Sequence, residues 1–170
     1  MSVDWAAVYR STYGDLVRFL YRKVWDADRA RDLAQETFLR ALDHAPESPR
    51  SWLFTIAANL ARDEARGELR RKRHLTLLRA EAEAEAASPP NPDPLREIER
   101  SERIAAARRA LDELGERDRE ILLLWHAGLS YREIAAETGL ALGAIGTTLA
   151  RARRRLAEAH DALEKKHAAH

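Results

Sequence analysis

The chain has no cysteine and only seven glycines among its 170 residues. Without cysteine it can form neither a disulfide framework nor a thiolate metal site. Long apolar runs are missing too, so no segment is predicted to insert into a membrane. The first residues, M-S-V-D-W-A-A-V-Y-R, lack the basic-then-apolar order of a secretory signal peptide. We therefore expect a cytoplasmic protein.

Runs of alternating apolar and polar residues, the pattern of half-buried strands, are also absent. Ala, Leu, Arg and Glu dominate instead, and these residues favour helices. In most segments apolar residues recur every three or four positions, as a helix with one buried face requires. An all-α fold is predicted, with helices over 4–25, 29–42 (Leu42 inward), 49–66 with an extension to 73, 95–114, 116–127, 131–138 and onward from 142.

A proline-rich, acidic segment divides the chain in two. Residues 74–94 hold four acidic side chains and one basic side chain, and the run S-P-P-N-P-D-P at 88–94 holds four of the six prolines. Proline at that density cannot continue a helix, so an extended linker is predicted. The sequence thus predicts two small helical domains, residues 1–73 and 95–170, joined by the linker 74–94.

The stretch from Leu129 to Leu156 has the pattern of a helix-turn-helix. Ser130 and Glu133 are placed to form a capping box at the start of a short helix. Gly139 supplies the left-handed residue that ends this helix. A second helix begins near Leu142, and its exposed face is expected to carry Ala144, Thr147, Thr148, Arg151 and Arg155. Short polar and basic side chains on such a helix are typical of proteins that read the DNA major groove.

Three motifs carry a resemblance to a known family. D-L-A-Q-E-T-F-L-R-A at 32–41 and S-W-L-F-T-I-A-A-N-L-A at 51–61 resemble the second conserved region of bacterial RNA polymerase sigma factors. The segment 111–135, which runs from L-D-E-L-G-E-R-D to L-S-Y-R-E-I-A, is similar to their fourth region. The length and the lack of other regions resemble the extracytoplasmic-function (ECF) class of the sigma-70 family. The resemblance covers nearly the whole chain except the linker and the last ten residues.

The resemblance implies a protein that binds core RNA polymerase, through its largest subunits, and directs initiation at promoter DNA. In the family, the helix matching 29–42 docks on a coiled coil of polymerase, and the matching contact residues here are Asp32, Gln35, Glu36 and Phe38. For Phe38 a position in the core is an equally open interpretation. The helix matching 49–73 captures unstacked bases of the minus-ten element, and its matching residues are Trp52, Asn59, Arg62, Asp63 and Arg66. Trp52 also fits a core position.

By the same resemblance, the helix-turn-helix reads the minus-thirty-five element as duplex. The residues expected nearest to DNA are Gly143, Ala144, Thr147, Thr148, Arg151 and Arg155. Many relatives have basic residues where this chain has Gly146 and Thr148, so we expect minus-thirty-five binding either to be weak or to depend on Arg151 and on backbone contacts. Members of the class are commonly held inactive by an anti-sigma protein, which makes such a protein an implied partner.

Two other functional classes, a stand-alone DNA-binding regulator and an enzyme, fit the sequence less well. A stand-alone helix-turn-helix regulator would bind DNA without polymerase, but the motif at 32–38 argues against it. An enzyme is not expected, because the chain has no glycine-rich phosphate loop and no nucleophile with a base at a recognisable spacing. No cofactor is implied. His160, His167 and His170 share one face of the tail, but without a carboxylate or thiolate to complete a shell we expect no metal site.

Overall fold

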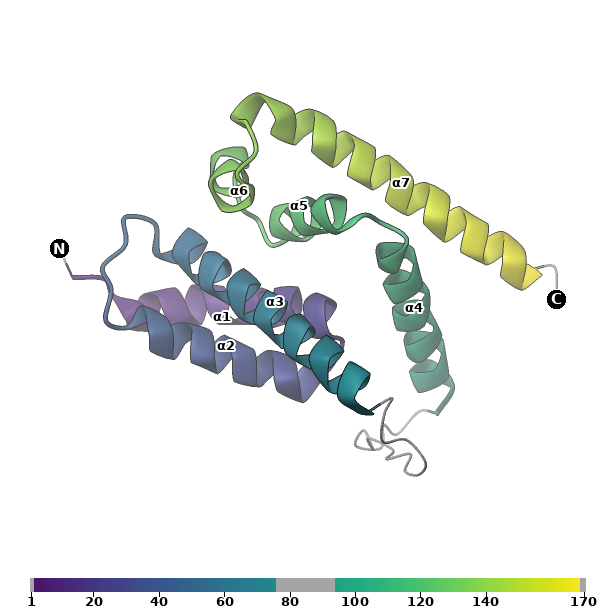
Figure 1. The fold of residues 1–170 in the computed structure, drawn as a ribbon, viewed down its shortest axis with the longest axis horizontal. Coiled ribbons are helices and arrows are strands. Elements are labelled where there is room, and N and C mark those ends of the chain that lie inside the picture. Colours follow the sequence, from purple (N-terminus) through teal and green to yellow (C-terminus); the bar gives the residue numbers. More distant parts are fainter. Residues whose placement is uncertain (1, 76–93, 169–170) are drawn as a thin grey trace.

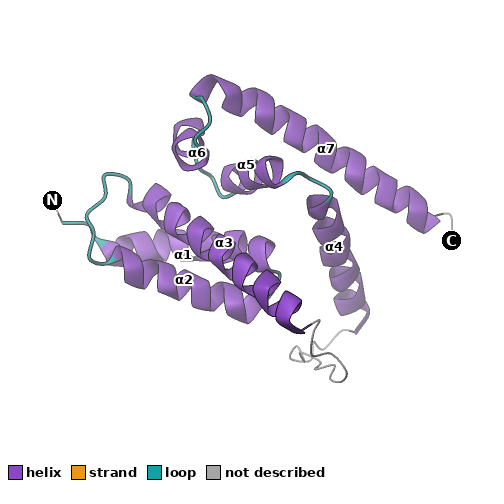
Figure 2. Cartoon of the chain, viewed as in Figure 1, coloured by secondary structure: helices purple, strands orange, loops and turns teal. Residues whose placement is uncertain are grey.

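The computed structural model describes residues 2–75 and 94–168. Within these ranges the chain forms seven α-helices and no strand, as Figure 2 shows. The N-terminal unit consists of α1 (Trp5–Val24), α2 (Ala27–Ala41) and α3 (Pro49–Leu75). The C-terminal unit consists of α4 (Pro94–Asp112), α5 (Glu116–His126), α6 (Tyr131–Thr138) and α7 (Leu142–Ala168). The prediction of an all-α chain with two helical units is confirmed, and most of the predicted linker lies outside the described residues.

Aspartates cap the first two helices of the N-terminal unit. The Asp4 side chain accepts a hydrogen bond from the Ala7 amide at 3.0 Å, and Asp26 accepts one from the Arg29 amide at 2.8 Å. Because the cap is Asp26, α2 begins at Ala27, two residues before the predicted start. The helix ends at Ala41, so Leu42 lies beyond the buried stripe and is 51% exposed. The expectation that Leu42 faces inward is therefore wrong.

The helix-turn-helix forms as its sequence predicts. The Glu133 amide donates to Ser130 Oγ at 3.3 Å, and the Ser130 amide donates to Glu133 Oε2 at 2.8 Å, which completes the capping box. Gly139 ends α6 with φ of 70°. In α7 the side chains of Ile145 and Leu149 are buried, as one face of the helix requires. The local order of the C-terminal unit thus follows from its caps and its apolar spacing.

The two units pack against each other through α5. In Figure 1, α5 lies between α7 and the N-terminal unit, and it contacts both α1 and α7. Buried apolar residues of both units, from Leu16 and Phe54 to Ile121 and Ile145, belong to one continuous hydrophobic core. None of the described helices is both long and apolar enough to cross a membrane. Arg62 of α3 and Glu137 of α6 also meet between the two units.

Candidate nucleic-acid interface

The polar residues predicted on α2 share one accessible face. Asp32 and Gln35 are exposed, and Glu36 is partly exposed and pairs with Arg40 at 2.5 Å. Phe38 is different, because only 7% of it is accessible and its ring lies 5.0 Å from the ring of Tyr9. The structure therefore places Phe38 in the core, which is one of the two positions that the sequence left open.

Most of the predicted minus-ten residues of α3 lie on its surface. Asn59, Asp63 and Arg66 are exposed. Trp52 is partly buried against the hydrophobic core, 5.7 Å from the His44 ring, so its core interpretation fits. Arg62 is partly buried, and its Nη1 donates to Asn59 Oδ1 at 2.6 Å.

Arg62 also takes part in an ionic cluster that joins the two units. Its Nη2 donates to Glu137 Oε1 of α6 at 3.2 Å and lies 3.6 Å from Glu120 Oε1 of α5. Glu120 in turn pairs with Lys23 of α1. We call Lys23, Arg62, Glu120 and Glu137 the four-charge cluster. It places two cations of the N-terminal unit against two carboxylates of the C-terminal unit.

The two cations of this cluster are not equivalent. Burial is the main cause that lowers the pKa of the Lys23 ammonium to about 7, and the nearby charges of Arg62 and Arg119 contribute to that shift. An arginine guanidinium, by contrast, stays charged throughout the physiological range. Arg62 is therefore the more constant cation of the pair.

A second set of contacts joins the start of α3 to the helix-turn-helix. The Arg50 guanidinium donates to the Ala127 carbonyl at the end of α5 and to Asp15 Oδ2 of α1 at 3.0 Å. The Ser48 hydroxyl donates to Glu133 Oε1 at 3.2 Å. A cation at the carboxyl end of a helix is favourable, because carbonyl groups there lack partners. Arg50 thus supplies a cap to α5 from the other unit.

The first turns of α7 present the predicted minus-thirty-five surface only in part. Gly143 and Thr147 are exposed, and Ala144 is partly exposed. Thr148 is 8% exposed, so the prediction that it lies on the outer face is corrected. The reason is its spacing: Thr148 follows Ile145 by three positions and precedes Ala152 by four, which puts it on the edge of the buried stripe.

Arg151 and Arg155 are bound within the C-terminal unit. Arg151 Nη2 donates to Asp118 Oδ1 at 2.8 Å, and Arg155 Nη1 donates to Asp118 Oδ2 at 2.7 Å. The Asp118 side chain is buried, and the hydrogen bond from Arg151 is the first cause that holds the pKa of its carboxyl below the ordinary value. In this conformation the two predicted DNA contacts anchor α7 to α5.

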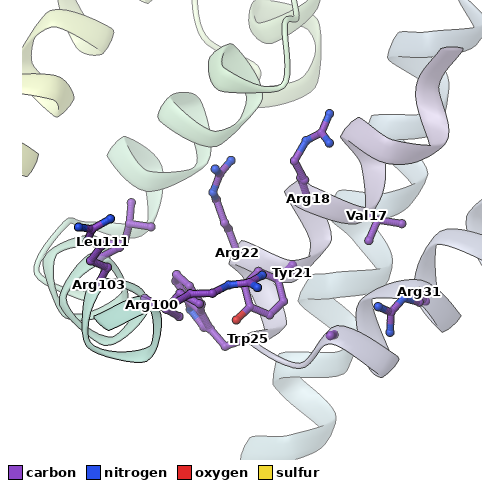
Figure 3. Close-up of a pocket in the computed structure, with 12 residues that line it drawn as sticks. Val17, Arg18, Tyr21, Arg22, Trp25, Arg31, Arg100, Arg103 and Leu111 are labelled. Carbon is purple, nitrogen blue, oxygen red and sulfur yellow. The ribbon is translucent and has the colours of Figure 1, made fainter. Parts of the chain in front are cut away.

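A groove lies between α1 and α4, with a volume of about 880 Å³. Figure 3 shows Tyr21 and Trp25 at its floor with Arg22 and Arg100 beside them. Its arginines are Arg18, Arg22, Arg31, Arg100 and Arg103, and none of the lining residues that the structure describes is a carboxylate. Burial and the Arg18 charge lower the pKa of Arg22. An apolar floor with a cationic rim suits an acidic, amphipathic partner.

The tail differs from its prediction in one respect. The side chain of His160 has carboxylates beside it, since its possible ligand atom and those of Asp161 and Glu164 lie within 4.8 Å of one another. All three residues are exposed and belong to one turn of α7, so helical spacing alone accounts for their proximity. The side chains of His167 and His170 lie outside the described residues.

Sequence reasoning did not find Lys23, Arg50, Glu120 or Glu137. One local signal existed: Glu120 precedes Leu124 by four positions and so falls on the buried face of α5. A carboxylate at such a position needs a cationic partner. The sequence does not show which cation supplies it.

Comparison with known proteins supplies the family. A family model of sigma-70 region 2 matches residues 8–73, which is most of the N-terminal unit. A model of sigma-70 region 4 matches residues 104–156. The chain belongs to the sigma-70 family. As a sigma factor of the ECF class it directs transcription initiation with core RNA polymerase, and the stand-alone regulator is not favoured.

Individual relatives agree with this assignment. The ECF RNA polymerase sigma factor EcfG of Rhodopseudomonas palustris is 39% identical over 137 residues, which cover 77% of this sigma factor and 71% of EcfG. The ferric citrate uptake sigma factor FecI of Escherichia coli is 32% identical, with 89% and 87% covered. The sigma factor RpoE of Bartonella quintana, solved with the anti-sigma factor NepR, superposes with a TM-score of 0.65 at 26% identity, covering 92% and 96%.

Proposed function

We propose that this sigma factor acts in the cytoplasm as a two-site adaptor without chemistry of its own. The N-terminal unit docks on the largest subunits of core polymerase and takes up the minus-ten element, while the C-terminal unit reads the minus-thirty-five element. The family matches carry the proposal, because regions 2 and 4 occur in this order on separate units. Polymerase would fix the separation of the units, so joint binding gains effective concentration that neither unit has alone.

Docking on polymerase is assigned to the outer face of α2. Asp32 and Gln35 are exposed there beside Glu36, so the three can make polar contacts without unfolding the unit. Phe38 supports that face from below through its contacts with Tyr9 and Tyr13. Its proposed contribution is therefore to position the polar residues.

Promoter contacts are assigned to α3 and to the first turns of α7. Unstacked bases need amide or aromatic surfaces, and the phosphates need cations. Asn59 and Arg66 are exposed and meet those needs; Asp63 is exposed as well, and Trp52 is partly buried near the start of α3. On α7, Gly143, Ala144 and Thr147 would approach the major groove, and Arg151 and Arg155 would reach phosphates from their anchor on Asp118.

An anti-sigma protein is proposed as a further partner. The structural relative from Bartonella quintana was solved with such a protein. The groove between α1 and α4 suits an acidic amphipathic helix, because its floor is apolar and Arg22 has no carboxylate partner within the described part of the chain.

The first experiment mixes the purified protein with bacterial core polymerase and fragmented genomic DNA and sequences the run-off transcripts. Discrete start sites that core polymerase alone does not give are expected, and the sequences upstream of them would define both promoter elements. Binding of DNA without any binding to core polymerase would instead favour a stand-alone regulator.

The docking face is tested by replacing Gln35 and Glu36 together with alanine. Both side chains are accessible, so we expect helicity to be unchanged and the affinity for core polymerase to fall about tenfold, the effect of losing roughly 1.4 kcal/mol. The affinity is measured by titration of labelled protein with core polymerase. Alanine at Arg10 and Ser11, two exposed positions of α1, serves as the matched control. Equal affinity of both variants would refute the assignment of α2.

A further inference from the structure

The start of α7 carries small and apolar side chains at the place where a helix-turn-helix meets the bases of DNA. In Figure 1, α7 lies on the side of the C-terminal unit that is away from the N-terminal unit. The exposed or partly exposed residues among positions 142–150 are Leu142, Gly143, Ala144, Gly146, Thr147 and Ala150. Thr147 is the only one of these six with a hydrogen-bonding group in its side chain. Because the first residues of the second helix contact the base edges, this surface has little capacity to read them by hydrogen bonds.

Two large apolar side chains border the same surface. Leu142 is 49% exposed, and Tyr131, the first residue of α6, is 45% exposed. The Tyr131 ring lies beside Gly146, because a Cβ there would be 3.5 Å from Tyr131 Cε2. Leu142 precedes Gly146 by four positions and so lies on the same side of α7 as the ring. Contact with water leaves these apolar groups unfavourably hydrated, so a partner that offers them apolar surface is favoured.

The nearest arginine of α7 is not free to read guanine. Guanine is ordinarily recognised by two hydrogen bonds from one guanidinium, to its O6 and N7 atoms. In Arg151, Nη2 donates to Asp118 Oδ1 at 2.8 Å, and Nε is buried without a hydrogen-bond partner in the described part of the chain. A two-donor contact with guanine therefore requires Arg151 to share or leave a carboxylate whose side chain is 4% exposed. A phosphate, by contrast, can be bound by Nη1 alone.

The other cations of the helix-turn-helix lie beside the surface that faces the bases. The arginines at 153–155 begin eleven positions after Leu142, which is about 16 Å along the helix axis. Arg132 is exposed at the start of α6, and the first helix of a helix-turn-helix crosses the DNA backbone. These cations are therefore assigned to phosphates, which hold a protein on the duplex without distinguishing one base pair from another.

We propose that the minus-thirty-five surface recognises T·A base pairs through the C5-methyl group of thymine, with Leu142 and Thr147 as the specificity-determining residues. The proposal rests on the function assigned to α7 above and names the feature of the duplex that α7 reads. Of the four ordinary bases only thymine presents a methyl group in the major groove, where alanine and threonine methyl groups contact it. Ala144 and Ala150, three positions before and after Thr147, extend the apolar surface on either side.

The test changes one chemical group of the DNA at a time. The templates are the strongest promoter found by run-off transcription and two copies that are modified only in the upstream element. In one copy deoxyuridine replaces thymidine, which removes the methyl group alone. In the other, 7-deazaguanine replaces any guanine, which removes the N7 acceptor alone. The full chain with core polymerase is titrated against each duplex. We expect deoxyuridine to weaken binding about fourfold for each methyl group contacted, and 7-deazaguanine to leave it unchanged.

Two variants assign the contact to its side chains. Leu142→Ala shortens an exposed side chain, and Thr147→Ser removes one methyl group while keeping the hydroxyl. For each we expect the ratio of the affinities for the thymidine and deoxyuridine templates to fall about fourfold. The matched control is Leu42→Ala, which shortens a leucine that is 51% exposed in the N-terminal unit. It should keep the full ratio. An unchanged ratio in both variants, or an equal loss in the control, would overturn the assignment.

The wild-type protein alone already decides between the outcomes, whatever the variants do. An upstream element without a T·A pair would overturn the proposal, as would equal binding of the thymidine and deoxyuridine templates. Weaker binding of the 7-deazaguanine template would show that a hydrogen bond to guanine is read instead. The absence of any start site would contradict the proposed function, and this inference with it. Start sites whose upstream element tolerates deoxyuridine would contradict this inference alone.

Discussion

Asp118 binds two arginines of α7 at once. Its buried carboxylate accepts hydrogen bonds from Arg151 and Arg155, which lie four residues apart and so on the same side of α7. One carboxylate near the start of α5 therefore fixes how α7 is rotated against α5. Asp118 therefore also sets the position from which the guanidiniums of Arg151 and Arg155 extend.

Replacing Asp118 with asparagine should destabilise the C-terminal unit. The change keeps the size of the side chain but removes the charge that both arginines share. We expect a loss of about 1–2 kcal/mol, less than for fully buried pairs because the two arginines are 42% and 53% exposed. Urea unfolding measures it. Asp112→Asn, which affects a more exposed pair with Arg119, is the control and should cost less.

The same residue predicts a dependence on pH. The two arginines lower the pKa of the Asp118 carboxyl in the folded protein below its ordinary value of 3.8. Its stabilising effect is therefore fully present above that value and is lost as the pH falls through the folded pKa. We expect the difference in unfolding free energy between the wild type and Asp118→Asn to be constant from pH 7 to pH 5 and to shrink near pH 3. A difference that grows on acidification would contradict this account.

At the scale of helices, the sequence predicted most of the boundaries. Ser130, Glu133 and Gly139 each act on their immediate neighbours, so the limits of α6 were predictable. Leu42 and Thr148 were assigned to the wrong face because periodicity describes the middle of a stripe better than its ends and edges. Whether Phe38 lies in the core could not be predicted from the sequence, because the rings around it belong to Tyr9 and Tyr13 of another helix.

Helix α7 carries a glycine where its backbone does not need one. A Cβ at Gly146 would lie 3.5 Å from Tyr131 Cε2, an ordinary van der Waals contact. Gly146→Ala should therefore stabilise the C-terminal unit by about 0.5–1 kcal/mol, since alanine loses less backbone entropy in a helix. Thermal unfolding checks the gain. Gly14→Ala in α1, where a Cβ would lie 3.7 Å from Arg18 Nη1, should give a similar gain in the N-terminal unit. Destabilisation by Gly146→Ala would mean that the Tyr131 ring cannot accommodate the added methyl group.

At the scale of the whole molecule, the packing of the two units was not predictable from the sequence. Lys23, Arg62, Glu120 and Glu137 lie far apart in the chain, and no short-range pattern pairs a given lysine or arginine with a given glutamate. The prediction of an all-α chain with two helical units is confirmed, while the bounds of the two domains stay a prediction. What it lacked was the interface, which depends on tertiary contacts at α5 and α6.

Alanine substitutions at two glycines with similar backbone conformations distinguish the cost of local backbone strain from an effect on the packing of the two units. Gly128 and Gly139 have φ of +88° and +70°, so alanine at either should cost about 1–2 kcal/mol. Only at Gly128 would the new methyl group meet Arg50 Nη2, whereas nothing lies within 4 Å of a Cβ at Gly139. We expect both variants to be less stable but only Gly128→Ala to show a larger radius of gyration in X-ray scattering. Equal radii would show that Arg50 does not hold the units together.

The neutral pairing of Arg62 has a consequence for a crowded bacterial cell. A chromosome offers an enormous excess of ordinary DNA, which attracts any protein with unpaired cations whatever its sequence. An arginine that is already paired with Glu120 and Glu137 adds less to that attraction than an unpaired arginine would. Each such pairing reduces binding to non-promoter DNA, so the protein spends more time free to bind core polymerase.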